Sequence, residues 1–261
     1  MDRRRIIEYA RAALPPVVFG VGFLTLWELW VVLADIKPFV IPKPSSIASA
    51  LFSDPGLVAK ASLVTGTNAL VGLICGTVVG FVLAVVTGRF RVVADLVNPL
   101  AITIAAVPAV VIVGVLNNMY SLDTQTPRRI MVTIAVFFVI FVQVSKGLRQ
   151  SNATQLELMR SYAATPRQAL VKVRLPNALS FLFTGIRTAA PIAVIIALVS
   201  EYFGGTQDGL GSKISGTLNS SNKALGFAYV VGGSVVGLAF FGASSLLEYY
   251  VVPWQRPRAA R

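Results

Sequence analysis

Long apolar runs alternate with short polar segments along almost the whole chain. The runs lie near residues 14–36, 61–87, 96–116, 129–145, 177–200 and 226–252. A helix needs about 20 consecutive, mostly apolar residues to cross a bilayer, and the fourth run is the shortest of the six. The pattern predicts an all-α, polytopic membrane protein of six transmembrane helices, forming a single domain over residues 1–261.

Small residues mark one face of the second predicted span. Gly72, Gly76, Gly80 and Ala84 follow one another at intervals of four residues, and such residues stack on one side of a helix. A face of this kind lets another backbone approach closely, so we expect this helix to pack inside the bundle. Asn68 in the same span is expected to hydrogen-bond another helix.

Pro99, Pro108 and Pro191 fall inside predicted spans. Each removes a backbone donor and is expected to kink its helix. The pattern leaves open whether such a kink serves as a hinge beside a pathway or only shapes the bundle.

The distribution of charge predicts the orientation. The chain is 55% hydrophobic and 13% charged, with a formal net charge of +12. With the N-terminus inside, 15 of the 23 lysine and arginine residues are cytoplasmic, seven are external and Arg187 lies within a span. This asymmetry predicts that both termini and the segment between residues 145 and 176 are cytoplasmic. Because the cations lie at span ends, they indicate contact with membrane lipid and not with nucleic acid.

Missing residue types exclude several kinds of chemistry. The sequence has no histidine, which excludes His-based acid–base catalysis, His-ligated zinc and the usual serine triad. The single cysteine, Cys75, lies in an apolar span and cannot form an intrachain disulfide. The glycine-rich segment at 209–214, GLGSKI, does not match an ATP-binding P-loop. We therefore expect no enzymatic activity, metal or cofactor in this chain.

A short surface helix is predicted between the first two spans. Prolines at 38, 42 and 44 precede it, and Ser45 or Ser46 is its expected N-cap. Ile47 gives it an apolar side, and Pro55 is its expected stop.

The polar segment at 156–176, LELMRSYAATPRQALVKVRLP, predicts two short helices joined by a bend. Met159 and Ala163 lie on the apolar side of the first helix, and Pro166 suits the first turn of the second. Pro176 then opens the fifth span. A short surface helix with exposed apolar residues is typical of a docking site.

This stretch resembles the cytoplasmic loop of permease subunits of binding-protein-dependent, ATP-driven importers. That loop carries E-A-A, three residues, G, nine residues and I-x-L-P, and the spacing here matches throughout. The matching residues are Glu157, Leu158, Met159, Ala163, Val173, Leu175 and Pro176. Leu-Met replaces Ala-Ala, Val replaces Ile, and Ala163 replaces a glycine, although alanine adopts a left-handed backbone less readily.

The likeness extends from about residue 38 to the C-terminus. The segments IPKPSSIASAL, LPNALSFLFTGIRTAAP, EYFGGTQDGLGSKI and LLEYYVVPW are similar to permeases of the nitrate, sulfonate and taurine class. NNMYSLDTQTPRRI and EYFGG are also similar to permeases for vitamin precursors such as hydroxymethylpyrimidine or riboflavin. The motifs do not separate these substrates.

The resemblance implies a type I importer permease fold that forms a translocation pathway in a prokaryotic inner membrane. It implies ATP-binding cassette ATPase subunits that carry ATP and magnesium, a second permease copy or a paralogue, and an extracytoplasmic substrate-binding protein. The substrate would be a small anion, such as nitrate, a sulfonate or taurine, or a pyrimidine or flavin precursor. The coupling loop, at about 151–176, would contact the ATPase through Glu157, Met159, Tyr162, Ala163, Ala164, Leu175 and Pro176.

Polar residues at membrane depth form a second set of candidates for the pathway. Arg187 lies near mid-bilayer, where it meets either an anionic substrate or a structural partner such as Glu28 or helix-end carbonyls. Glu201, followed by turns at Gly209 and Gly211, ends the fifth span on the outer side. It either gates the pathway or only ends the helix.

Other kinds of membrane protein remain as alternatives. A coupling subunit of a vitamin importer with a membrane-embedded substrate binder would share the ATPase, but the likeness of the external loops argues against it. A stand-alone secondary transporter would show paired intramembrane carboxylates or repeated halves, and only Glu28 fits. An intramembrane enzyme would need a nucleophile with a base, which the sequence does not offer.

Overall fold

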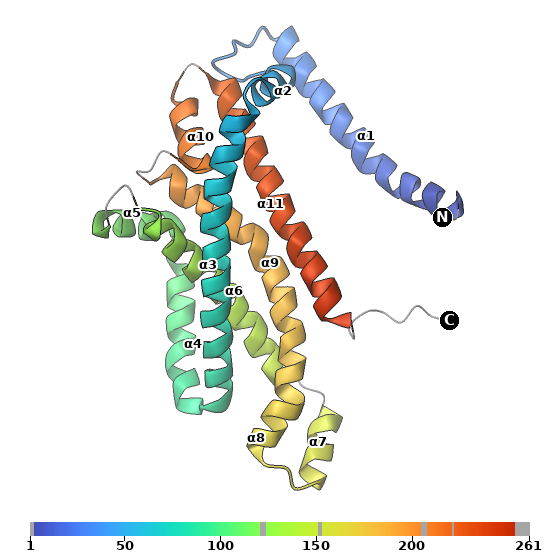
Figure 1. Ribbon diagram of the computed structural model, residues 1–261, viewed down its shortest axis with the longest axis vertical. Coiled ribbons are helices and arrows are strands. Elements are labelled where there is room, and N and C mark those ends of the chain that lie inside the picture. Colours follow the sequence, from blue (N-terminus) through green and yellow to red (C-terminus); the bar gives the residue numbers. More distant parts are fainter. Residues whose placement is uncertain (1–2, 121–123, 151–152, 205–207, 221, 254–261) are drawn as a thin grey trace.

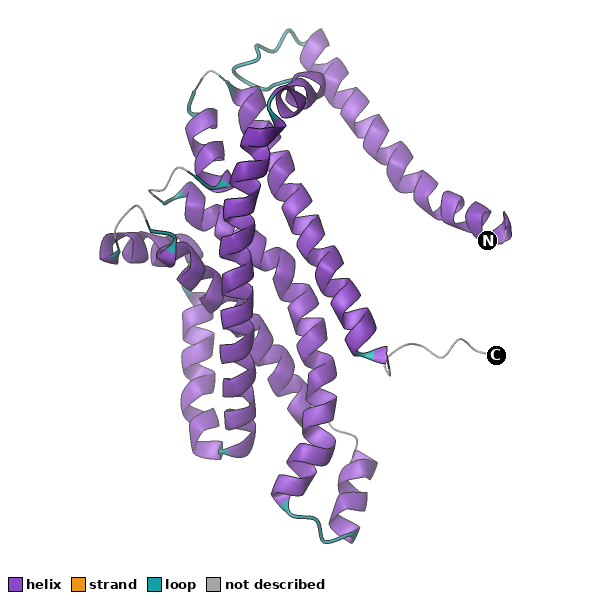
Figure 2. Ribbon diagram, viewed as in Figure 1, coloured by secondary structure: helices purple, strands orange, loops and turns teal. Residues whose placement is uncertain are grey.

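The computed structural model describes residues 3–120, 124–150, 153–204, 208–220 and 222–253. Every regular element in these ranges is a helix (Figure 2), which confirms the predicted all-α class. In chain order the elements are α1 (Arg3–Leu33), α2 (Pro44–Ser53), α3 (Pro55–Arg89), α4 (Arg91–Ala106), α5 (Ala109–Met119), α6 (Thr126–Arg149), α7 (Ala153–Ser161), α8 (Pro166–Ala169), η1 (Leu170–Arg174), α9 (Leu175–Tyr202), α10 (Leu210–Leu218) and α11 (Lys223–Val251).

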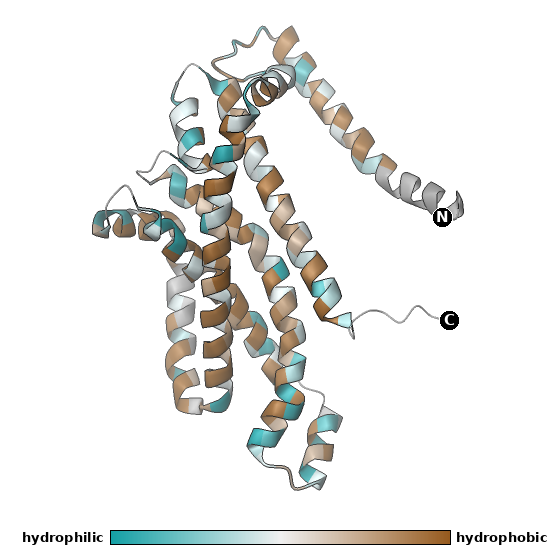
Figure 3. Ribbon diagram, in the orientation of Figure 1, coloured by the Kyte–Doolittle hydropathy of each residue, from teal (hydrophilic) through white to brown (hydrophobic). Residues whose placement is uncertain are grey.

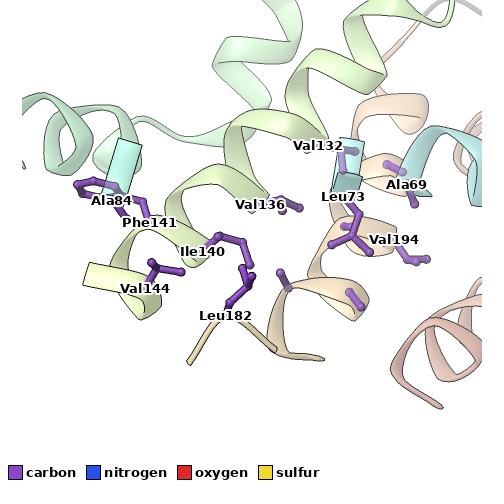
Figure 4. Close-up of a cluster of buried hydrophobic side chains, with 14 of the residues drawn as sticks. Ala69, Leu73, Ala84, Val132, Val136, Ile140, Phe141, Val144, Leu182 and Val194 are labelled. Atoms are coloured by element: carbon purple, nitrogen blue, oxygen red, sulfur yellow. The ribbon is translucent and has the colours of Figure 1, made fainter. Parts of the chain in front are cut away.

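Three long helices form the centre of the bundle. α3, α6 and α9 pack against one another, and α11 packs against α9 (Figure 1). Their contact buries a continuous apolar cluster that includes Leu73, Ile140 and Val194 (Figure 4). Hydrophobic residues run along these helices, whereas hydrophilic residues gather on α7, α8 and the loops (Figure 3).

The first helix, α1, stands apart from this bundle (Figure 1). It contacts α2, and the Trp27 ring meets the Phe227 ring of α11 edge-on, with 6.2 Å between centroids. Many of its apolar side chains are exposed, Phe19 to 75% and Leu33 to 82%. A helix of this length with exposed apolar side chains is suited to lipid contact.

The third predicted span is divided. Five helical segments among the described residues are long and apolar enough to cross a membrane: Leu14–Leu33, Pro55–Arg89, Thr126–Arg149, Pro166–Tyr202 and Lys223–Val251. The run at 96–116 instead falls into α4 and α5, with Val107 and Pro108 between them. Proline has no N–H to continue the ladder and pushes the preceding residue toward an extended conformation. Pro99 and Pro191 remain inside continuous helices.

The glycine face of α3 lies directly against α6. A Cβ built on Gly76 would lie 2.7 Å from the Thr133 carbonyl oxygen, and one on Gly80 would lie 2.7 Å from the Phe137 carbonyl oxygen. These distances leave no room for a methyl group, so the close approach of the two backbones requires glycine. The prediction of a packed, interior helix is confirmed.

The predicted surface helix is present as α2, but its N-terminus is capped in another way. Pro44 is its first residue, so neither Ser45 nor Ser46 is the N-cap. The Ser45 N–H and hydroxyl instead donate to the Glu28 carboxylate, at 3.0 and 2.7 Å. A carboxylate from α1 thus satisfies a free N–H in the first turn of α2. Pro55, the predicted stop, also begins α3.

We predict that Gly76→Ala lowers the free energy of unfolding by about 1–3 kcal/mol, because the added methyl meets backbone that cannot yield without separating α3 from α6. The measurement is the midpoint of thermal unfolding in detergent, followed by circular dichroism. Gly237→Ala on α11 is the matched control, because nothing lies within 4 Å of a Cβ at that position. Equal midpoints for the two variants would contradict the close approach.

Candidate coupling surface and intramembrane polar cluster

The predicted bend between two short helices is built around a left-handed residue. At the end of α7 the Ala164 N–H donates to the Met159 carbonyl and the Ala163 N–H to the Arg160 carbonyl, each at 2.9 Å. Ala163 has a φ of 49°. This is the Schellman arrangement, in which glycine usually occupies the left-handed position. The alanine that replaces a glycine in the sequence motif therefore adopts the backbone that favours glycine.

A single helical run leads from this bend into the fifth span. Thr165 and Gln168 form a reciprocal capping box at the start of α8. The π-helix η1 follows, and the Leu175 N–H donates to the Leu170 carbonyl five residues earlier. Pro176 comes next; a proline would clash with the carbonyl four residues before it, and the wider turn relieves this clash. The predicted direct junction between the loop and the span is present.

The surface around α7 combines an exposed end with an open groove. Tyr162 is 76% exposed and Leu158 is 56% exposed, and Glu157 is exposed on the same helix. A groove of about 620 Å³ lies between α7 and the start of α9, and its lining includes Met159, Val173 and Pro176. The structure thus brings most of the predicted coupling residues to one end of the molecule.

Arg187 on α9 pairs with Glu248 on α11. Its Nη1 lies 2.9 Å from Glu248 Oε2, and the other carboxylate oxygen accepts the Thr184 hydroxyl at 2.8 Å. The side chains are 46% and 15% exposed. The predicted pairing of Arg187 with Glu28 is wrong, because the Glu28 carboxylate binds the first turn of α2 instead.

Glu201, at the end of α9, is fully buried. Its Oε2 accepts the Thr65 hydroxyl at 2.7 Å and the Gly211 N–H at 3.1 Å, and its Oε1 accepts from the Asn68 amide at 3.2 Å. The Leu210 N–H donates to the Thr65 hydroxyl at 2.9 Å. One carboxyl group therefore joins α9 to α3 and to the start of α10.

Two glycines make this junction possible. A Cβ on Gly209 would overlap the Glu201 carboxyl group, and one on Gly211 would overlap the Leu198 carbonyl oxygen on α9. The start of α10 can reach Glu201 only because both residues lack a side chain. The predicted role of Glu201, Gly209 and Gly211 in gating remains a prediction.

Arg128 lies beside Gly204, close to the Glu201 end of α9, and the sequence did not mark it as a candidate because the charge distribution counts it among the seven external cations. Its side chain is fully buried, and Nη1 donates to the Thr124 carbonyl at 2.6 Å. Nε and Nη2 have no hydrogen-bond partner among the described residues, and Gly204 lies directly against the guanidinium group. Arginine next to a proline at the start of a span is typical of an exposed flank, so no local signal marks its burial.

Asn68 connects Glu201 to the start of α6. Its amide donates to Gln125 Oε1 at 2.9 Å, and its carbonyl oxygen accepts from Arg129 Nε at 3.2 Å. The predicted helix-to-helix hydrogen bond of Asn68 is confirmed.

Comparison with known proteins identifies the family. Residues 76–258 match the family described as the inner membrane component of binding-protein-dependent transport systems. The chain belongs to this family. The permease is 27% identical over 253 residues to the formylaminopyrimidine transport permease of Halalkalibacterium halodurans, covering 94% of this chain and 97% of the relative. It is 24% identical over 234 residues to the riboflavin transport system permease of Chloroflexus aurantiacus, covering 89% and 87%.

The fold of the permease agrees with this family. An inward-facing structure of the MetNI methionine ABC transporter matches with a TM-score of 0.64 at 18% identity, covering 75% of this chain and 96% of that chain. The predicted type I importer permease fold and the inner-membrane location are confirmed. The permease is thus a transport component, and its family implies ATPase and substrate-binding-protein partners.

We predict that Thr65→Val destabilises the permease by about 1–3 kcal/mol, because it removes one of the two hydrogen bonds to Glu201 Oε2 and leaves the Leu210 N–H without a partner in a buried site. The two side chains have nearly the same shape, so the loss reports the hydrogen bonds. Thermal unfolding in detergent measures it. Thr67→Val is the control, because Thr67 is exposed on the same helix. A Thr65→Val variant as stable as the Thr67→Val variant would show that the Glu201 junction contributes little.

Proposed function

We propose that this permease forms the translocation pathway of an ATP-driven importer and receives the motion of a cytoplasmic ATPase through α7. The observation that carries the proposal is the unbroken helical run from Pro166 to Tyr202, which begins beside the exposed end of α7 and contains Glu201 near its other end. A displacement of α7 and α8 would pass along this one stiff element through the membrane. ATP and magnesium belong to the ATPase subunits, and this chain supplies no cofactor.

The α7 surface suits a groove on a protein partner. Tyr162 is exposed next to charged residues, and tyrosine is one of the residue types that contribute most of the binding energy at protein interfaces. In this proposal the ATPase contacts Glu157, Met159, Tyr162, Ala163 and Ala164, while Leu175 and Pro176 pass the motion into α9.

The end that carries α7 and α8 faces the cytoplasm in this proposal, and both termini lie on that side. The N-terminal end of α1 and the C-terminal end of α11 point away from α2 and α10, which lie at the opposite end (Figure 1). The positive-inside rule supports the same orientation. A binding protein would then deliver substrate at the α2 and α10 end.

A second permease copy, or a paralogue, completes the pathway. The support is the Arg187–Glu248 pair, which lies within the long helices while the arginine side chain remains 46% exposed. A charged pair that faced lipid at this depth would be costly, so its open side is better placed toward another subunit or an aqueous pathway. A homodimer would place two such pairs along the shared pathway.

For the substrate we favour a polar heterocycle of the pyrimidine or flavin class over a small anion such as nitrate, a sulfonate or taurine. The charge of Arg187 is already balanced by Glu248. The pair presents both a donor and an acceptor, which suits the ring of a heterocycle, whereas an unpaired cation would suit an anion. The relative that transports formylaminopyrimidine is matched over 97% of its length.

Two other transport roles remain as alternatives. A coupling subunit for a membrane-embedded substrate binder would also use α7 but would need no soluble binding protein. A stand-alone secondary transporter would need no ATPase.

We predict that Tyr162→Asp weakens binding of the ATPase subunit roughly tenfold or more, because it places a charge at an anchor of the proposed interface. Co-purification with the cognate ATPase subunit, and titration of the permease with that subunit, measure this loss. Phe39→Asp is the control: Phe39 is also exposed, to 59%, but lies in the loop between α1 and α2 at the opposite end. Retained ATPase binding by a folded Tyr162→Asp variant would contradict the coupling assignment.

We predict that a pyrimidine or flavin, loaded on the binding protein, stimulates ATP hydrolysis by the reconstituted complex, whereas nitrate, a sulfonate and taurine do not. Stimulation by one of these anions alone would show that the permease imports an anion. It would also support the alternative in which Arg187 contacts the substrate. Stimulation without the binding protein would favour the membrane-embedded binder, and uptake without the ATPase would favour the secondary transporter.

A further inference from the structure

A basic pocket lies at the same end of the molecule as the coupling loop, where α3, α4, α6 and η1 meet. Its volume is about 730 Å³, which is within the range of pockets that bind small ligands. Arg89 at the end of α3, Arg149 at the end of α6 and Arg174 in η1 line it. The carboxylate in the lining is Asp95 of α4, so the charged lining is net positive.

The three arginines are available to a ligand. The described residues form ion pairs at Lys37–Asp35 and Arg187–Glu248, and neither pair involves these arginines. Arg174 Nε is buried without a hydrogen-bond partner in the described part of the chain. So is the hydroxyl of Ser145, which lines the same pocket. Both residues line the pocket, so a ligand there would lie close to two polar groups that lack a partner among the described residues.

We infer that this pocket binds the phosphate group of an anionic phospholipid headgroup. Guanidinium groups recognise phosphate oxygens through paired, charge-assisted hydrogen bonds, and the hydroxyl of Ser145 supplies a further donor from the lining. A basic pocket between helices on the cytoplasmic side is suited to such headgroups. Val92 and Leu96 of α4, beside Asp95, are 74% and 64% exposed and offer a surface for acyl chains.

Occupancy of the pocket would brace the point at which the coupling loop enters the membrane. Arg149 belongs to α6 and Arg174 to η1, so one phosphate held by both would tie the π-helix to the central bundle. The inference does not depend on which substrate the permease carries.

The test is binding of fluorescent phosphatidylglycerol to the purified full-length permease in detergent, with phosphatidylcholine as the reference lipid. The wild type is expected to prefer phosphatidylglycerol. Arg149→Gln combined with Arg174→Gln should reduce this preference roughly tenfold or more, because two cations near the headgroup are lost. The matched control, Lys213→Gln combined with Lys223→Gln, removes the same charge at the α10 end and should keep the wild-type preference.

A single variant and a competition experiment distinguish the possible outcomes. If the double variant does not fold, Arg149→Gln alone tests the pocket, because this side chain is exposed. Wild-type preference in these folded variants, or an equal loss in the lysine control, would overturn the site. Competition by inorganic phosphate would assign the pocket to a soluble phosphate and overturn the lipid source. Failure of phosphate to compete, together with loss of lipid binding in the arginine variants, would support the lipid headgroup.

Discussion

The backbone contact between α3 and α6 is the constraint on which the rest of the bundle depends. Lipid chains are as apolar as leucine, so helices in a membrane associate by close packing and hydrogen bonds and gain little from burying apolar surface. Gly76 and Gly80 allow this packing, because a Cβ at either position would meet the backbone of α6. α9 packs against both helices and completes the central trio, which sets the positions of Arg187 and Glu201.

The two ends of α9 are joined to the neighbouring helices in different ways. At the end near Tyr202 the buried carboxyl group of Glu201 holds α3 and the start of α10 through hydrogen bonds to Thr65, Asn68 and Gly211. At the other end the π-helix η1 and Pro176 join α9 to α8 without a break in the helical run. In the proposed coupling, motion that enters at α7 would meet one continuous helical run whose far end is held by several partners, an arrangement that favours transmission of the motion over local bending.

Three charged residues of the long helices, Glu201, Arg187 and Arg128, occupy different environments. Glu201 is satisfied inside the bundle, Arg187 is paired yet half exposed, and Arg128 is buried with part of its guanidinium group unpartnered among the described residues. A satisfied and buried group stabilises the chain by itself. The paired group with an open side supports the proposed second subunit or aqueous pathway, because exposure of the pair to lipid would be unfavourable.

The sequence by itself determined five of the six predicted spans, the interior face of α3 and the form of the loop at 151–176, because these depend on residues close together on one helix or turn. The spacing of the motif even placed Ala163 where the chain needs a left-handed backbone. Tertiary structure decided which carboxylate meets which cation: Glu28 binds α2, and Glu248 meets Arg187. It also decided the burial of Arg128. Thr65 and Glu201 are 136 residues apart, and partners so distant along the chain leave no local pattern, because only the packing of the helices brings them together.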